Sequence, residues 1–122
     1  MLWFITTAEY DNFLRSKPYA VLLFDAPWNA TGKPLRPRFE FANCEFGDQV
    51  NFAEVNTDEE MDLARAVKIE GVPSVAFYRN GVLVAAYLGA SQDASAQTRA
   101  LISGDDVKYI AAKQPIFKNK KG

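Results

Sequence analysis

The chain has 122 residues, the length of one compact domain, with 48% hydrophobic and 24% charged residues, which is ordinary for a globular protein. Its net charge of −1 provides no overall field for nucleic acid, and the absence of histidine excludes Ser–His and Cys–His catalytic pairs. One cysteine excludes an intrachain disulfide and a cysteine-rich zinc site. We therefore expect neither a metal nor a cofactor.

The first part of the chain alternates short apolar runs with helical patterns. A strand is expected over residues 2–5. A helix is expected over residues 7–16, because Thr6 and Glu9 have the spacing of a capping box. Residues 20–25 are almost continuously apolar, which indicates a central strand covered on both faces.

The middle of the chain continues this alternation. A helix is expected from Pro34 to Gly47, with the proline in the first turn, where its missing N–H has no partner to lose. Its inward-facing apolar positions are Leu35, Phe39, Ala42 and Phe46. A strand over residues 50–55 and a helix over residues 58–67 follow, with Asp58 as the expected N-cap.

The C-terminal part predicts a hairpin and a last helix. Residues 74–78 and 82–88 read as strands joined by Asn80-Gly81, the dipeptide that a type I′ turn favours. A helix is expected over residues 92–103, and a short further turn of helix over residues 105–112. The order βαβαβαββα predicts an α/β fold with a central mixed β-sheet flanked by helices.

The sequence shows no repeat or linker that would divide it. We expect a single domain over residues 1–113 and a basic flexible tail over residues 114–122. The apolar run at residues 1–5 is too short for a secretion signal or a membrane span. We therefore expect a cytoplasmic protein with no membrane partner and no nucleic-acid partner.

The most informative segment is residues 24–33, Phe-Asp-Ala-Pro-Trp-Asn-Ala-Thr-Gly-Lys, which joins the central strand to the next helix. It resembles the active-site loop of the thioredoxin family, which reads Trp-Cys-Gly-Pro-Cys-Lys. Trp28 and Lys33 are kept, whereas Asn29 and Gly32 stand at the two cysteine positions.

Further segments match that family in order. They are Asn56-Thr57-Asp58, Gly71-Val72-Pro73-Ser74, Phe77-Tyr78-Arg79-Asn80-Gly81 and Leu88-Gly89-Ala90. The resemblance covers about residues 3–103 and implies the thioredoxin fold. It also implies a cis bond between Val72 and Pro73, with the Val72 backbone exposed for strand addition by a peptide. The alternative is an ordinary trans-proline that opens an edge strand.

The departures from the family pattern concern its chemistry. Neither Asn29 nor Gly32 can form the thiolate that attacks a disulfide. Leu23 stands where the family has a buried aspartate that assists proton transfer, and an unused buried carboxylate is costly to keep. Asp25 and Lys33 flank the loop and are expected to be solvent-exposed charges. These changes predict a redox-inactive protein that is not an enzyme.

The leading functional hypothesis is a protein- or peptide-binding module, or an accessory subunit of a larger assembly. The resemblance implies a groove that holds an extended peptide. Its expected residues are Trp28, Asn29, Ala30, Thr31, Gly32, Thr57, Gly71, Val72, Pro73, Gly89 and Ala90. The expected partner is an unidentified protein or extended peptide, and weak self-association as a homodimer is also considered.

An alternative hypothesis is a thiol–disulfide oxidoreductase or redox sensor that uses Cys44 alone. On the expected helix Cys44 lies nine residues after Leu35, which points it away from the inward face and places it about 15 Å along the axis from the loop. Glu40 and Glu45 are close in sequence and disfavour a thiolate there. A third hypothesis has the last helix and the tail bind a partner.

Overall fold

The computed structural model describes residues 2–113, so the expected tail lies outside the described residues. In chain order the elements are β1 (Trp3–Phe4), a 3₁₀ turn (Thr7–Glu9), α1 (Tyr10–Arg15), β2 (Tyr19–Asp25), a second 3₁₀ turn (Ala30–Gly32), α2 (Leu35–Phe46), β3 (Val50–Asn56), α3 (Met61–Val67), β4 (Ser74–Arg79), β5 (Val82–Leu88) and α4 (Ala94–Ser103). No helix within this part of the chain is long and apolar enough to cross a bilayer.

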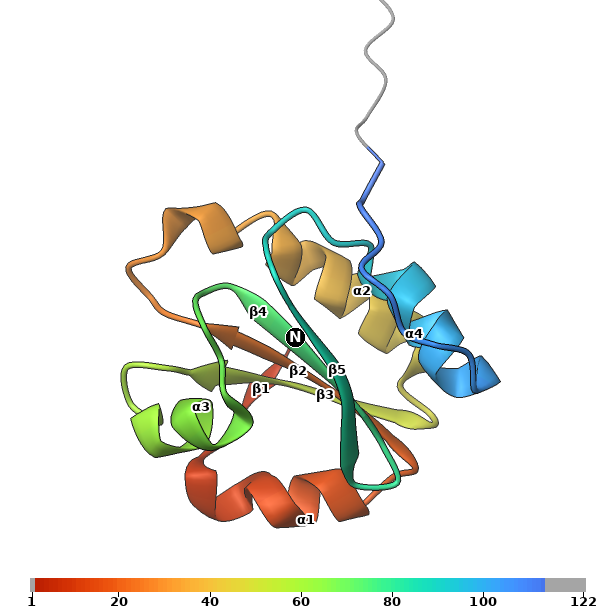
Figure 1. Cartoon of the computed structure of the whole chain (residues 1–122), viewed down its shortest axis with the longest axis horizontal. Helices are drawn as coiled ribbons and strands as arrows, with labels where there is room; N and C mark the ends of the chain where they lie inside the picture. Colours follow the sequence, from red (N-terminus) through yellow and green to blue (C-terminus); the bar gives the residue numbers. More distant parts are fainter. Residues whose placement is uncertain (1, 114–122) are drawn as a thin grey trace, which may run out of the picture.

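The strands form one mixed sheet in the order β1-β3-β2-β4-β5. β1 and β2 run parallel to β3, β4 runs antiparallel to β2, and β5 closes the hairpin with β4. Helices α2 and α4 cover one face of the sheet, and α1 and α3 cover the other (Figure 1). The α/β class, the mixed sheet and the single domain are thus those that the sequence predicts.

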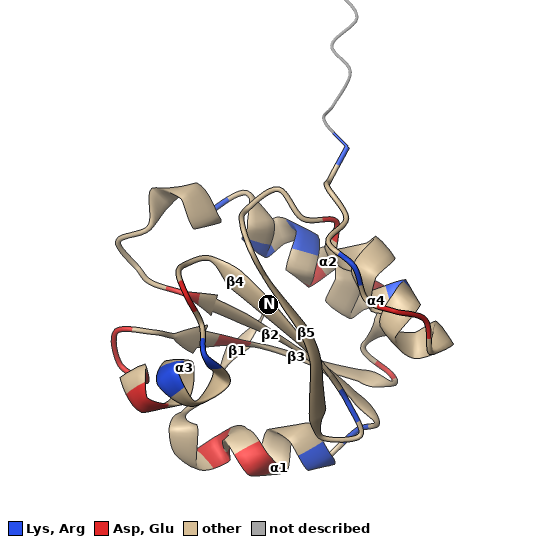
Figure 2. Cartoon of the chain, viewed as in Figure 1, with Lys and Arg blue, Asp and Glu red and all other residues tan. Residues whose placement is uncertain are grey.

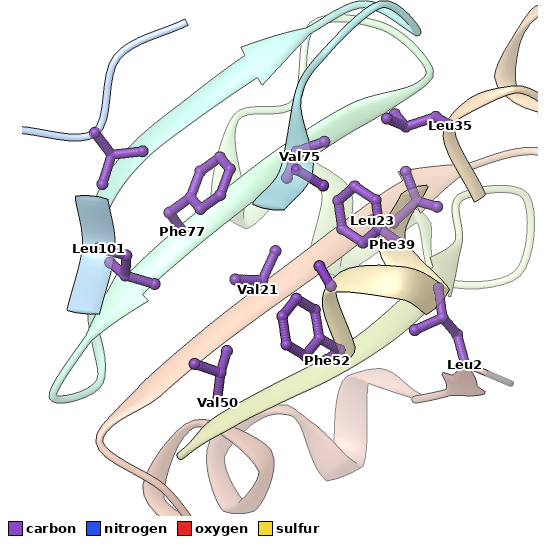
Figure 3. Close-up of a cluster of buried hydrophobic side chains, with 13 residues drawn as sticks. Leu2, Val21, Leu23, Leu35, Phe39, Val50, Phe52, Val75, Phe77 and Leu101 are labelled. Carbon is purple, nitrogen blue, oxygen red and sulfur yellow. The ribbon is translucent and has the colours of Figure 1, made fainter. Parts of the chain in front are cut away.

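The core is divided by the sheet into two apolar clusters, and β2 contributes to both. Side chains alternate across a strand, so Val21 and Leu23 face α2 and α4, whereas Leu22 and Phe24 face α1 and α3. All four are completely buried. Figure 3 shows the cluster between the sheet and helices α2 and α4, in which Phe39 of α2 lies over the sheet. The continuous apolar run of this strand is therefore explained by burial on both faces.

Two helix starts illustrate how local hydrogen bonds set the boundaries. The expected capping box is present at the start of the 3₁₀ turn that leads into α1, where the N–H of Thr6 donates to Oε1 of Glu9 at 2.9 Å. The start of α3 differs from the prediction, because Asp58 is not its N-cap and the helix begins at Met61. The side-chain oxygen of Asn56 accepts the N–H of Asp58 at 2.9 Å, which holds these residues in a turn before the helix.

The expected turn of helix over residues 105–112 is wrong. This segment instead runs back along the start of α4, where the N–H of Asp93 donates to the Ile110 carbonyl and the N–H of Ala112 donates to the Ser91 carbonyl, both at 2.8 Å. The fully buried side chain of Gln97 also donates to the Lys108 carbonyl at 3.2 Å. These long-range hydrogen bonds satisfy the backbone without a helix.

Candidate functional site

The expected site residues gather at the end of the sheet where β2 and β3 finish. The backbone N–H of Thr57 donates to the carbonyl of Asp25 at 2.9 Å. The register of β2 with β4 places Pro73 beside Asp25 on the other side, and the N–H of Gly89 donates to the Pro73 carbonyl at 2.9 Å. Thr57, Pro73 and Gly89 therefore follow one another across the sheet, with the loop of residues 26–33 joining β2 to α2 at the same end (Figure 1).

The Val72–Pro73 peptide bond is cis, the isomer that the resemblance implied, and not the trans bond of the alternative. The Pro73 ring is buried, while Gly71 and Val72 are half-buried. The hydroxyl of Ser74 donates to the carbonyl of Gly71 at 2.7 Å and ties this turn to the first residue of β4. The backbone around Val72 is thus held in place at the edge of the site.

Trp28 is the most exposed large side chain of the loop, with 69% of its surface accessible. Its indole N–H donates to Oδ1 of Asp58 at 3.2 Å, which orients the ring toward the segment that follows β3. Ala30 and Thr31 are also exposed, and the Thr31 hydroxyl donates to the Asn29 side-chain oxygen at 2.7 Å. We call eight of the expected groove residues, all exposed or half-buried, the rim surface; they are Trp28, Ala30, Thr31, Thr57, Gly71, Val72, Gly89 and Ala90.

Beneath the rim surface, the side chain of Asp25 occupies the space that a side chain at position 32 requires. A Cβ atom added to Gly32 would lie 2.0 Å from Oδ2 of Asp25, far inside van der Waals contact. Oδ1 of Asp25 accepts the N–H of Ala26 at 2.9 Å and the side-chain amide of Asn29 at 3.0 Å. Both residues at the family's cysteine positions are therefore part of one arrangement around this carboxylate.

The prediction that Asp25 is a solvent-exposed charge is wrong, because only 5% of the residue is accessible. Sequence reasoning treated Asp25 and Gly32 separately, although the burial of the carboxylate depends on the missing side chain of the glycine. The available signal was the combination of an acidic residue at a strand end with a glycine where the family has a larger residue.

An ion pair next to the loop, between the buried Glu54 and the partly exposed Arg36, has no signal in the sequence. Glu54 of β3 is 2% exposed and lies beside Leu23 in the β2–β3 register. Its carboxylate accepts two hydrogen bonds from the guanidinium of Arg36, one of them from Nε at 3.0 Å. The hydrogen bonds and charge of Glu54 raise the pKa of Arg36 above its ordinary value. A cleft of 290 Å³ here is bounded by Phe4, Asp25, Pro27, Arg36, Glu54 and Asn56.

Cys44 lies on α2 and is exposed, in agreement with the prediction from its helical position. The buried side of this helix is formed by Leu35, Phe39 and Ala42, so the thiol is not directed into the core. It is also remote in sequence from the loop, near the opposite end of the helix. Among residues 2–113 no group of three or more potential metal-ligating side chains is found.

The family model of thioredoxin matches residues 1–100 of this chain. The chain belongs to the thioredoxin family. Thioredoxin from Gallus gallus is 32% identical over 93 residues, which cover 75% of this chain and 88% of the chicken protein. The structure of mitochondrial thioredoxin 3 from Saccharomyces cerevisiae superimposes with a TM-score of 0.73 at 21% identity, over 84% of this chain and 94% of the yeast chain, and supports the fold.

Disulfide isomerases are also among the relatives of this thioredoxin-family chain. Protein disulfide isomerase-like 1-4 from Oryza sativa subsp. japonica is 30% identical over 84 residues, which cover 66% of this chain. The matched region is only 15% of the rice protein, so the similarity concerns one part of a much longer chain.

These relatives contradict the prediction that the chain is not an enzyme. They are thioredoxins and protein disulfide isomerases, which are oxidoreductases. The prediction took the loss of the loop cysteines and of the buried aspartate as decisive and left activity at Cys44 only as the alternative. That step does not follow, because Cys44 is exposed and a single thiolate exchanges with a disulfide.

Proposed function

We propose that this thioredoxin-family protein binds an extended polypeptide segment on its rim surface. The observation that carries the proposal is the exposed indole of Trp28, held by Asp58 at the same end of the sheet as the Val72 backbone. An extended ligand segment would pair with that backbone by strand addition, which gives affinity without a requirement for one sequence. Trp28 would supply the aromatic contact that commonly dominates such interfaces.

The test compares the two tryptophans of the chain. Trp28 and Trp3 are 69% and 78% exposed, but Trp3 lies on β1, at the edge of the sheet. The probe is a fluorescein-labelled insulin B chain, reduced and alkylated so that no thiol takes part, and its anisotropy reports binding. We expect Trp28→Ala to raise Kd about tenfold or more and Trp3→Ala to leave it unchanged. Equal Kd values for Trp28→Ala and the unmutated protein would exclude the rim surface as the binding site.

A second candidate function is thiol–disulfide exchange at Cys44, and the oxidoreductase relatives favour it. The Cys44 thiolate would attack one sulfur of a substrate disulfide, form a mixed disulfide and release the other sulfur as a thiol. A low-molecular-weight thiol such as glutathione would then attack the substrate sulfur of the mixed disulfide. Cys44 returns to its thiol form, while the attacking thiol ends in a disulfide with the substrate sulfur.

This second candidate is tested with a peptide disulfide and excess glutathione. Mass spectrometry of the acid-quenched protein should show a mixed disulfide, and the rate of peptide reduction should exceed the rate with glutathione alone. Cys44→Ser should abolish both signals, whereas Asn43→Ser on the same helix should keep them. A rate that survives Cys44→Ser would rule out the cysteine as the reacting group.

A further inference from the structure

Strand β5 concentrates exposed apolar side chains at one edge of the sheet. Of the ten large hydrophobic residues that are exposed in the described part of the chain, four lie on this strand, namely Val82, Leu83, Val84 and Leu88. Their exposed fractions range from 40% to 62%. The seven residues of β5 include no charged side chain and no proline. Such a concentration of apolar surface is typical of an interaction site.

The backbone of β5 is equally open to a partner. Within residues 2–113 it pairs with β4 on one side and with no strand on the other. Natural edge strands usually prevent pairing with another chain by a charged side chain, a proline, a β-bulge or extreme shortness. Of these β5 has only a bulge, a register shift that leaves Val84 without a partner on β4, and four of its residues follow the bulge in regular register. The opposite edge, β1, is protected by its length of only two residues.

We propose that two copies of this chain pair through β5, antiparallel and about a twofold axis, so that their two five-stranded sheets form one continuous sheet. A twofold axis brings the same surface of each copy together. Each β5 then pairs with an identical strand, and neither strand places a charge against the other. A charged foreign strand would find no opposite charge on β5, whereas a second copy brings apolar side chains of the same kind beside it. The dimer would end on the short β1 edges at both sides, which favours a closed pair over an extended aggregate.

The charges at the two ends of β5 are compatible with this arrangement. Antiparallel pairing places the β4–β5 hairpin of one copy beside the far end of β5 in the other. Strand β5 is tan in Figure 2 because none of its residues is charged. Beyond its ends, Arg15 and Lys17 share a hollow with the hairpin, whereas Glu70 and Lys68 share one with Leu88. The basic end of one copy therefore lies beside the end of the other copy where Lys68 and Glu70 have opposite charges. The pairing brings no clusters of like charge together.

The size of β5 predicts a weak association. A stable protein interface typically involves about 20–30 residues on each side and about 800 Å² per partner. Seven strand residues with a few neighbours provide less than this, so the dimer should form and dissociate with concentration. The β5 surface adjoins the rim surface at Leu88, which lies against Gly71, but Val82 and Val84 lie toward the other end of the strand, and the proposal does not depend on polypeptide binding.

Sedimentation equilibrium tests the proposal on the full chain. Between about 1 μM and about 1 mM, the range in which weak complexes dissociate, the mass should rise from 13.6 kDa toward twice that value. Val84→Lys should raise the dissociation constant about tenfold or more, because a lysine on the edge opposes strand pairing. The control is Phe41→Lys, which alters a residue of α2 that is 62% exposed and should leave association unchanged.

Three results would overturn the proposal: a constant mass of 13.6 kDa over the whole range, growth beyond the dimer, or equal association of Val84→Lys and the unmutated protein. Val82→Lys provides a second edge variant if Val84→Lys does not fold, as judged by circular dichroism. Amide hydrogen exchange gives an independent readout. Protection should increase with concentration at residues 82–88 and stay constant in α2.

Discussion

The inside of the β2–α2 loop and the rim surface around it have diverged to different degrees from the family pattern. Inside the loop, Asp25, Asn29 and Gly32 form a compact polar arrangement in place of two cysteines. On the rim, Trp28 remains exposed and the Gly71–Pro73 turn keeps its family sequence. The dithiol and the surface around it are therefore separable parts of this fold. Substitutions inside the loop should mainly change stability, and substitutions on the rim should mainly change binding.

The largest expected effect concerns the ion pair beneath the loop. Arg36→Ala would leave the carboxylate of Glu54, whose side chain is 3% exposed, without its partner. Because the Arg36 side chain is 44% exposed and water can partly replace it, we expect a loss of about 2–4 kcal/mol in the free energy of unfolding, measured by urea titration. The control is Arg65→Ala, which removes an exposed ion pair with Asp62, with an N···O distance of 3.8 Å, and should change stability by no more than about 1 kcal/mol. Similar losses for the two variants would show that the Arg36–Glu54 pair has no special role.

Restoration of the inner cysteine should also destabilise the protein. Gly32→Cys places a side chain where Asp25 already lies, so we expect a loss of about 1–3 kcal/mol in the same titration. Ala30→Cys introduces the same residue at an exposed position of the loop, where the expected change is within about 0.5 kcal/mol. Full stability of Gly32→Cys would contradict the assigned position of the Asp25 carboxylate.

The double variant tests whether Asp25 and Gly32 form one unit. Asp25→Ala removes the carboxylate that blocks position 32, so Gly32→Cys should cost less in that background than in the unmutated protein. We expect a coupling free energy of about 1 kcal/mol or more in a double-mutant cycle. Strict additivity of the two single changes would mean that the residues do not compete for the same space.

The smallest expected effect on stability belongs to the rim. Trp28→Ala removes a side chain that is mostly in solvent and forms one hydrogen bond, to Asp58, at the surface. The free energy of unfolding should change by no more than about 0.5 kcal/mol, even where the same variant loses polypeptide binding. A loss of several kcal/mol would instead make Trp28 a structural residue and would remove the distinction between the loop interior and its rim.

The fold could be predicted from the sequence because its main signals are local. The apolar run of β2, the Asn80-Gly81 turn and the Thr6–Glu9 capping box each depend on neighbouring residues, and each is found where expected. Boundaries were less predictable. α3 starts three residues later than expected because the side chain of Asn56 competes for the backbone N–H groups before it.

The candidate site was predictable in its outline and not in its interior. The matched segments identify Trp28, Pro73 and Gly89 one by one, and the register of the sheet brings them to one end. The position of the Asp25 carboxylate and the pairing of Arg36 with Glu54 depend on side chains from separate elements. No periodicity in the chain indicates the Arg36–Glu54 pair, and the only signal for the Asp25–Gly32 contact is a glycine where the family has a larger residue.

By itself, the sequence of this protein determined the order of its strands and helices, its membership in the thioredoxin family and the absence of a dithiol at positions 29 and 32. These properties follow from residue identity and short-range patterns. Only the tertiary structure decided that Asp25 is buried against Gly32 and that the apolar strand β5 is left at an open edge. Both depend on how side chains and strands pack, since burial and edge exposure are properties of the packed chain and not of local propensity.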